Sequence, residues 1–403
     1  MLYSCKSSLN LFKPAFPHEA YQNKLVKAGL DQTAMGTSWI NAASESLEKA
    51  VEITVPFRET GYFAAEKVPA AAFKFSVERG QKINIKLTTK PDEDFMVYLD
   101  VFEQDGAGKN DRFASADTLN NPVEIDTDEN TTYLVRLQPE LLKSGQYTLE
   151  ITAGPSLEFP IKTTRTNSIQ SFFGDGRDAG TRKHEGVDIF APRRTPVLAV
   201  ADGRVVRVNE NNLGGLVVWM RPKGKNYTLY YAHLDEQIAT EGQLVSTGDT
   251  LGLMGNTGNA RTTAPHLHFG IYTPSGAVDP LAFINPAKKP MPEIRADLDQ
   301  LNATMRNTKG EIVYISAASA NSYKTELPDG KVGYLPSTQL SRVDKPLRKL
   351  KLGSEQTALY DRPDSSAAVK TNLAVGQIVD LLGNFGSYHF VTDQRNQSGW
   401  VSK

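Results

Sequence analysis

The chain has 403 residues, which is enough for two to four domains of ordinary size. Hydrophobic residues make up 39% and charged residues 23%, which indicates a folded globular protein and excludes a disordered one. The formal net charge is −1, and no apolar run approaches the roughly 18 residues of a spanning helix, so we expect neither nucleic-acid binding nor a membrane-spanning segment.

The N-terminal region, residues 1–45, is polar and mixed, with one short helical stretch in "HEAYQNKLVKAGL". We predict that it is a tether or linker. Cys5 is the only cysteine, so no disulfide forms within the chain. Leu2, Tyr3 and Ser4 before it resemble the end of a bacterial lipoprotein signal whose earlier basic and apolar parts are missing, either trimmed or lost with a late start. A lipid on Cys5 is one hypothesis, and an ordinary N-terminal cysteine is the alternative.

Residues 46–160 alternate apolar and polar side chains in several short segments, separated by turn-rich stretches. This pattern predicts an antiparallel β-sandwich. An acidic stretch between two of the strands, "EIDTDEN", offers carboxylates for calcium, but its spacing matches no calcium-binding loop, so a solvated turn is favoured. The inward-facing residues that we predict are Phe73, Phe75, Val77, Ile83, Ile85, Leu87, Tyr133, Val135, Leu137, Tyr147, Leu149 and Ile151.

A second β-rich block, residues 165–290, contains four of the six histidines of the chain. In "KHEGVDIFAP", His184 and Asp188 are four residues apart in an extended segment, so their side chains point the same way, and Gly186 between them lets the backbone turn closely. Alone, such a pair is usually a surface ion pair. With one distant histidine, however, it makes a three-ligand set that leaves a position open, as in catalytic zinc sites.

Two further segments bring histidines with strand spacing. His266 and His268 in "APHLHFGIY" project from the same face of a strand. His233 ends the strand "YYAHLD", with Tyr231 on the same face as either a hydrogen-bond donor or a packed aromatic residue. Three such segments in one block are hard to explain as buried structural histidines, so we interpret them as one site.

The segment from Ser171 to about Phe283 resembles the lysostaphin-type zinc metallopeptidase domain, whose motifs His-x-Gly-x-Asp, a histidine after a strand, and His-x-His read here "HEGVD", "AHLD" and "HLH". The likeness extends to "SFFGDGRDAG", "VSTGDTLGLMGNTGNA" and "AVDPLAFI". The resemblance implies one bound Zn²⁺ and an enzyme that cleaves peptides of bacterial peptidoglycan at cross-links or bridges. It also implies a role for each residue. The metal ligands would be His184, Asp188 and His268. The catalytic histidines would be His233 and His266, with the division of roles between them left open.

Some relatives with this fold are non-catalytic regulators that activate another wall hydrolase, and their mark is the loss of ligand residues. This chain has lost none, so an active enzyme is favoured and a regulator is the alternative. The resemblance also implies an envelope location, either periplasmic, lipid-anchored in the outer membrane or secreted, and we expect a monomer. If the lipoprotein likeness at Cys5 holds, a cross-link between D-alanine and a diamino acid is a better candidate than a glycine bridge.

The C-terminal region contains a faint repeat, in which "YKTELPDGKVGYLPSTQL" is echoed by "YHFVTDQRNQSGWVSK". Each copy has an aromatic-led strand, a polar hairpin and a Gly-aromatic-aliphatic triplet. They resemble the end of a bacterial SH3-like barrel, so we predict two such barrels, at residues 298–343 and 345–403; an irregular β-tail is the alternative. The whole chain is therefore expected to be all-β and multidomain.

Overall fold

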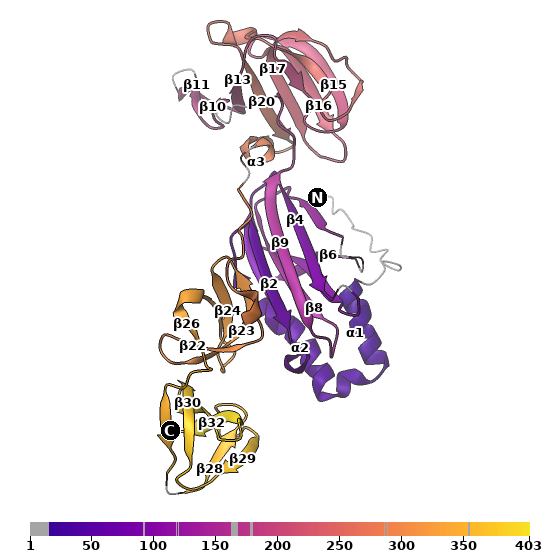
Figure 1. The fold of residues 1–403 in the computed structure, drawn as a ribbon. Coiled ribbons are helices and arrows are strands. Elements are labelled where there is room, and N and C mark those ends of the chain that lie inside the picture. The colour runs from indigo at the N-terminus through magenta and orange to yellow at the C-terminus, as the bar shows by residue number, and fades with distance from the viewer. Residues whose placement is uncertain are drawn as a thin grey trace.

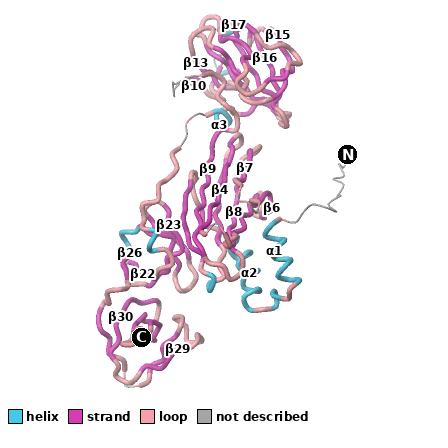
Figure 2. The backbone as a smooth tube through the Cα atoms, turned by 45° about the vertical axis from the view of Figure 1, so that its right-hand side comes forward, coloured by secondary structure: helices cyan, strands magenta, loops and turns pink. Residues whose placement is uncertain are grey.

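The computed structural model describes residues 16–91, 93–117, 119, 121–162, 168–177, 180–285, 287, 289–353 and 355–403. Strands dominate it, and the predicted all-β, multidomain class is confirmed. Figures 1 and 2 show an elongated molecule with the block that contains the four histidines at one end and the sandwich in the middle. The strands of residues 304–342 lie beside the sandwich, and those of residues 348–402 lie at the other end. Within the described residues, no helix combines the length and apolar character needed to cross a bilayer.

The N-terminal region is helical and packed. Trp39 is 1% exposed, and its indole N–H donates to the Pro139 carbonyl over 2.8 Å. It forms an apolar cluster with Leu25 and Tyr98, so the prediction of a tether is wrong from residue 17 onward, because packing against the sandwich stabilises these helices. Cys5 lies outside the described residues. The elements are α1 (Pro17–Lys27), the 3-10 turn η1 (Leu30–Gln32) and α2 (Ala34–Glu48).

The middle region is a sandwich of two sheets. One sheet has the strand order β1-β3-β8-β5-β6, and the other contains β2-β9-β4-β7. Each of the apolar residues predicted to face inward is at most 4% exposed, because strand alternation directs it between the two sheets. The elements are β1 (Val51–Glu52), β2 (Phe57–Phe63), η2 (Ala65–Lys67), β3 (Ala71–Val77), β4 (Gln81–Lys90), β5 (Val97–Gln104), β6 (Asn110–Ser115), β7 (Val123–Asp126), β8 (Thr131–Pro139) and β9 (Gly145–Pro155).

The block that contains the four histidines is built on a sheet of order β10-β13-β20-β17-β16-β15-β18, with β14, β19 and β21 paired beside it. One apolar cluster fills its interior, including the fully buried Val187, Leu267 and Phe269. Its elements are β10 (Ile169–Ser171), β11 (Gly176–Arg177), β12 (Arg182–Lys183), β13 (Val187–Phe190), β14 (Pro196–Leu198), β15 (Gly203–Asn211), β16 (Gly215–Pro222), β17 (Thr228–Gln237), β18 (Leu244–Val245), β19 (Thr250–Met254), η4 (Gly258–Ala260), β20 (His266–Thr273), β21 (Gly276–Val278) and α3 (Leu281–Ile284).

Two of the contacts between this block and the sandwich are hydrogen bonds or ion pairs. The amide of Leu157, just after β9, donates to the Phe283 carbonyl over 2.9 Å. The ammonium group of Lys225 lies 3.1 Å from a carboxylate oxygen of Asp126 and 3.4 Å from one of Asp128, both in the acidic stretch considered for calcium. A lysine therefore neutralises part of that stretch, which favours a turn over a calcium site.

The C-terminal strands form two groups, and the first is continuous with the sandwich. β23 pairs with β2, so its sheet runs β25-β24-β23-β2-β9-β4-β7, with β22 and β26 beside it. The second group has the order β27-β30-β31-β32-β28-β29. The elements are η5 (Leu298–Gln300), β22 (Thr304–Asn307), β23 (Ile312–Ser319), β24 (Ser322–Glu326), β25 (Val332–Pro336), η6 (Ser337–Gln339), β26 (Leu340–Arg342), β27 (Arg348–Lys351), β28 (Thr357–Tyr360), β29 (Val369–Leu373), β30 (Ile378–Phe385), β31 (Tyr388–Thr392) and β32 (Ser398–Ser402).

Both copies of the sequence repeat fold as hairpins, β24–β25 and β31–β32. The SH3-like identity of the two groups stays a prediction. The first group is not a free-standing module, because the fully buried Glu59 of β2 accepts hydrogen bonds from Tyr147 of β9, over 2.6 Å, and from Tyr334 of β25. A buried carboxylate that bridges the two parts is costly to expose, so it fixes the group on the sandwich.

Candidate metal centre

Three side chains predicted to bind a metal meet on two adjacent strands. β13 and β20 pair antiparallel with Asp188 directly opposite His268, and His184 lies just before β13. Nε2 of His184 lies 3.0 Å from Oδ1 of Asp188 and 2.9 Å from Nδ1 of His268, and those two atoms are 3.1 Å apart. His184 is 2% and Asp188 8% exposed, so both face the interior of the site.

The donor set fits a zinc ion. Two imidazole nitrogens and one carboxylate oxygen converge within about 3 Å of one another, and this combination of ligands leaves a fourth position open in catalytic zinc sites. A comparison of all histidine, cysteine and carboxylate side chains in the described residues gives the same three, His184, Asp188 and His268, as close enough together to hold a metal ion.

Neighbouring groups orient two of the three candidate ligand side chains, those of His184 and Asp188. Nδ1 of His184 lies 2.9 Å from the Phe172 carbonyl, so it carries the proton and leaves Nε2 as a lone pair in the cluster. The other carboxylate oxygen of Asp188 accepts a hydrogen bond from Arg177 over 2.9 Å. Burial alone would raise the pKa of Asp188, but its contacts with the imidazoles of His184 and His268 outweigh burial and hold that pKa well below its usual range.

The two remaining histidines share one hollow with the ligands. The rings of His233 and His266 are 4.9 Å apart, and the ring of His233 is 5.9 Å from that of His268. Nδ1 of His233 donates to the Thr257 carbonyl over 2.9 Å, and Nδ1 of His266 donates to the Ala264 carbonyl over 2.8 Å. In each ring Nε2 is therefore the nitrogen left for chemistry.

His233 is held neutral and in an unusual backbone conformation. Burial, and next the charges of His266 and His268, lower the pKa of His233 to about 4. Its φ is +63°, a value rare outside glycine, and its amide donates to the Gly214 carbonyl over 2.7 Å. A strained residue at a functional position is consistent with a ring placed for chemistry.

The positive φ of His233 changes which aromatic residue faces the site. Tyr231, predicted to share a face with His233, is fully buried in the core, where its hydroxyl accepts a hydrogen bond from the Val200 amide, so the packed alternative is correct. Tyr230 lines the hollow instead, with its ring 5.9 Å from that of His268. Strict period-two alternation along β17 does not predict that Tyr230, rather than Tyr231, lines the hollow.

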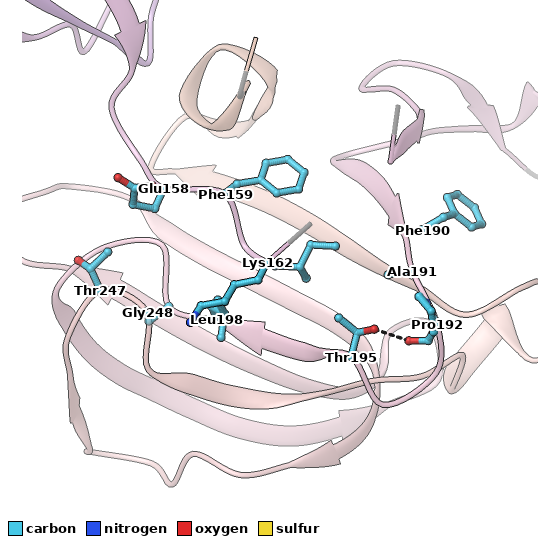
Figure 3. Close-up of a pocket in the computed structure, with 12 residues that line it drawn as sticks. Glu158, Phe159, Lys162, Phe190, Ala191, Pro192, Thr195, Leu198, Thr247 and Gly248 are labelled. Atoms are coloured by element: carbon cyan, nitrogen blue, oxygen red, sulfur yellow. Dashed lines mark hydrogen bonds between the residues drawn. The ribbon is translucent and has the colours of Figure 1, made fainter. Parts of the chain in front are cut away.

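The hollow has a volume of about 640 Å³. Its wall contains charged and aromatic residues that the sequence patterns did not single out. The alternation of side chains in the strands "GLVVWM" and "YTLYYAHL" was the sequence signal that could have identified aromatic residues of this wall. Phe190, whose ring stacks on His266 at 4.9 Å, also lines a second hollow of about 760 Å³. Figure 3 shows this second hollow, with Phe190 at one edge and Phe159 and Lys162 farther along. The residues that line the hollow with the four histidines and were not identified from the sequence include Arg177, Arg182, Glu185, Asn211, Leu213, Trp219, Tyr230 and Tyr272.

A buried His–Asp–His cluster with two more histidines in one hollow, carried on an antiparallel sheet, is the arrangement of a metal-dependent hydrolase site. The sequence model of Peptidase family M23 matches residues 182–280, and this part of the chain is an M23 peptidase domain. The resemblance inferred from the motifs is thereby confirmed for this domain.

Relatives of the domain include enzymes named for peptidoglycan peptides. The chain is 35% identical over 130 residues to the L-Ala–D-Glu endopeptidase of Bacillus subtilis, a match that covers 30% of this chain and 39% of that protein. It is 36% identical over 128 residues to the peptidoglycan DD-endopeptidase ShyA of Vibrio cholerae, covering 30% and 29%. The chain thus spans well under half of the length of these curated relatives.

Among solved structures, the catalytic domain of lysostaphin from Staphylococcus simulans is 29% identical. The match covers 30% of this chain and 97% of that one, with a TM-score of 0.27.

Proposed function

We propose that this protein is a zinc-dependent endopeptidase that hydrolyses peptide bonds in bacterial peptidoglycan. The observation that carries the proposal is the complete set of His184, Asp188 and His268 within hydrogen-bond distance of one another, with His233 and His266 in the same hollow. The M23 match and the peptidoglycan endopeptidases among the relatives support the choice of substrate.

In this mechanism, His184, Asp188 and His268 would hold a zinc ion. When bound there, it would supply Lewis-acid polarisation of a carbonyl group and would lower the pKa of water to roughly 7. His233 accepts the proton of the attacking water, because its low pKa keeps the imidazole neutral near pH 7. In its protonated form, His266 completes the pair by donating from Nε2 a hydrogen bond to the carbonyl oxygen or a proton to the departing amine.

The substrate lies outside the cytoplasmic membrane, so we place the protein in the cell envelope or outside the cell. Attachment through a lipid on Cys5 is part of this proposal and is tested by mass spectrometry of the native protein, in which an unmodified Cys5 would contradict it. Of the bonds available in peptidoglycan, we favour a cross-link, since one of the relatives is named a DD-endopeptidase.

The test of the proposed function uses purified full-length protein and isolated peptidoglycan, with and without a metal chelator. We expect soluble peptides with new amino termini, identified by mass spectrometry, that disappear with chelator and return when zinc is added. If no chelator-sensitive peptide is released, but the protein increases release by a second wall hydrolase, it is a regulator instead.

A further inference from the structure

Three aromatic rings and one carboxylate continue from the metal ligands along one wall of the hollow. The ring of Tyr230 lies edge-on to the ligand His268, with centroids 5.9 Å apart. Trp219 lies opposite Tyr230 on the neighbouring strand, 4.2 Å between centroids, and Tyr272 is 5.6 Å from Trp219 and 6.0 Å from Tyr230. The hydroxyl of Tyr272 donates to the carboxylate of Glu185 over 3.3 Å.

This wall is open to a ligand, although part of it is packed. Trp219 and Tyr272 are half-buried and Glu185 is exposed, and all three line the hollow together with Tyr230. Gly270, opposite Tyr230 on β20, makes the arrangement possible. A Cβ at that position would lie 3.0 Å from the ring of Tyr272, so a side chain there would displace it.

The carboxylate of Glu185 and the three aromatic rings attract a cation at this end of the hollow, which Arg177 and Arg182 also line. Burial, and next the negative charge of Glu185, raise the pKa of Tyr272, and the positive charge of Arg182 opposes them with a smaller effect. An ammonium group is attracted both by a carboxylate and by the faces of tryptophan and tyrosine rings, most strongly where rings meet as a cage.

We propose that Trp219, Tyr230, Tyr272 and Glu185 form a subsite for a primary ammonium group carried by the substrate peptide. This inference rests on the proposed function for the identity of the ligand as a peptide. The ring of Tyr230 lies 5.9 Å from that of His268, and an extended chain advances by about 3.3–3.6 Å per residue, so we assign the amine to a residue one or two positions from the scissile bond. The subsite therefore selects peptides by a free amine near the bond that is cut.

The test compares two forms of one ligand on the full-length protein: a cross-linked peptide dimer isolated from peptidoglycan, and the same dimer after acetylation of its free amines. Binding is measured by calorimetry on the metal-free protein, and kcat/KM on the zinc-loaded protein. We expect the free amine to be preferred roughly three- to thirtyfold in both measurements, the range typical of a partly desolvated cation among aromatic rings.

Variants separate the subsite from general packing. Glu185→Gln and Trp219→Leu should each reduce the preference to about twofold or less with unchanged zinc content, because they remove the charge and one ring but no ligand. Trp219→Phe should keep most of the preference. Glu241→Gln, an exposed glutamate that does not line the hollow, is the matched control and should behave like the unaltered protein.

Equal binding of the two dimers, or a preference that survives both Glu185→Gln and Trp219→Leu, would overturn the subsite. If both dimers are cleaved equally well and bound equally well, the proposed function stands and the subsite fails. If the free amine is preferred in binding but neither dimer is cleaved, the subsite stands and the proposed endopeptidase activity fails.

Discussion

The five histidine and aspartate side chains of the site divide into two groups by the atoms that they direct into the hollow. His184, Asp188 and His268 present ligand atoms within about 3 Å of one another. His233 and His266 instead anchor Nδ1 on backbone carbonyls and lie beside the cluster. The division predicts different consequences when a side chain from each group is removed.

We expect His268→Ala to lose zinc and activity together, because two ligands hold the ion far less tightly than three. His233→Ala, in contrast, should keep its zinc and lose about 10²–10⁴-fold in activity, the usual contribution of a general acid or base. Metal analysis of the purified variants and rates on a cross-linked peptide check both results. Zinc retained in His268→Ala would show that the ligand assignment is wrong.

Arg177 acts on the site through Asp188, whose outer oxygen accepts its hydrogen bond over 2.9 Å. Arg177→Gln should weaken zinc binding by about 10–100-fold, as is usual when a group that orients a ligand is lost. Competition with a chromophoric chelator measures this affinity directly. The control is Arg207→Gln, an exposed residue of β15, which should leave the affinity unchanged. Equal affinities in both variants would mean that Arg177 has no role in orienting Asp188.

At the scale of elements, close contact between two turns positions His233. Gly215 begins β16 with φ of +65°, and a Cβ there would lie 2.2 Å from Oγ1 of Thr257. Thr257 in turn accepts the Nδ1 hydrogen bond of His233 through its carbonyl. The sequence showed a glycine pair at this point but not its partner, because Thr257 is about 40 residues further along the chain.

Gly215→Ala and Gly224→Ala form a matched pair that tests this contact. Both glycines have positive φ, +65° and +74°, but nothing lies within 4 Å of a Cβ at Gly224. Each variant should lose about 1–2 kcal/mol of unfolding free energy from backbone strain. Gly215→Ala should lose at least about 2 kcal/mol more and much of its activity, with zinc content preserved. Equal unfolding free energies, measured by urea denaturation, would contradict the contact.

Strand elements were predictable where alternation is regular and where their partners are near in sequence. The inward-facing residues of the sandwich and the pair His266 and His268 follow period two. The aromatic wall did not, since the positive φ of His233 shifts the face of β17 and brings Tyr230, not Tyr231, to the site. Motif spacing therefore located the three candidate metal ligands, whereas the residues around them depend on backbone geometry that no local pattern specifies.

At the scale of the whole molecule, contacts distant in sequence join the domains, and these were the features that sequence patterns missed. His18 of α1 lies 2.6 Å from the side-chain oxygen of Gln138, 120 residues away, and 3.1 Å from Arg136. The helices appeared to be a linker because the apolar partners of their few apolar side chains, such as Tyr98 of β5, lie far away in the sequence. The same holds for Glu59, whose partner Tyr334 comes from the C-terminal strands.

Acid should loosen the N-terminal helices. Burial, and next the charge of Arg136, lower the pKa of His18 from 6.5 to about 4. Between these values the unfolded chain binds a proton that the folded one does not, so this docking is most stable above pH 6.5 and weakens as the pH falls toward 4, by roughly 3 kcal/mol. Hydrogen exchange of residues 17–48 at pH 7 and pH 4.5 measures the change. His18→Asn should show a smaller pH dependence, and an unchanged one would contradict the assignment.

The most direct test of the central claim, that zinc in the His184–Asp188–His268 cluster drives peptide hydrolysis, is a zinc titration of the metal-free protein. Cleavage of a cross-linked peptidoglycan peptide is followed at each step. We expect the rate to rise linearly and to level off at one zinc per chain, and Asp188→Asn to show no such rise in the same range. A rate that does not depend on zinc, or that saturates identically in Asp188→Asn, would contradict it.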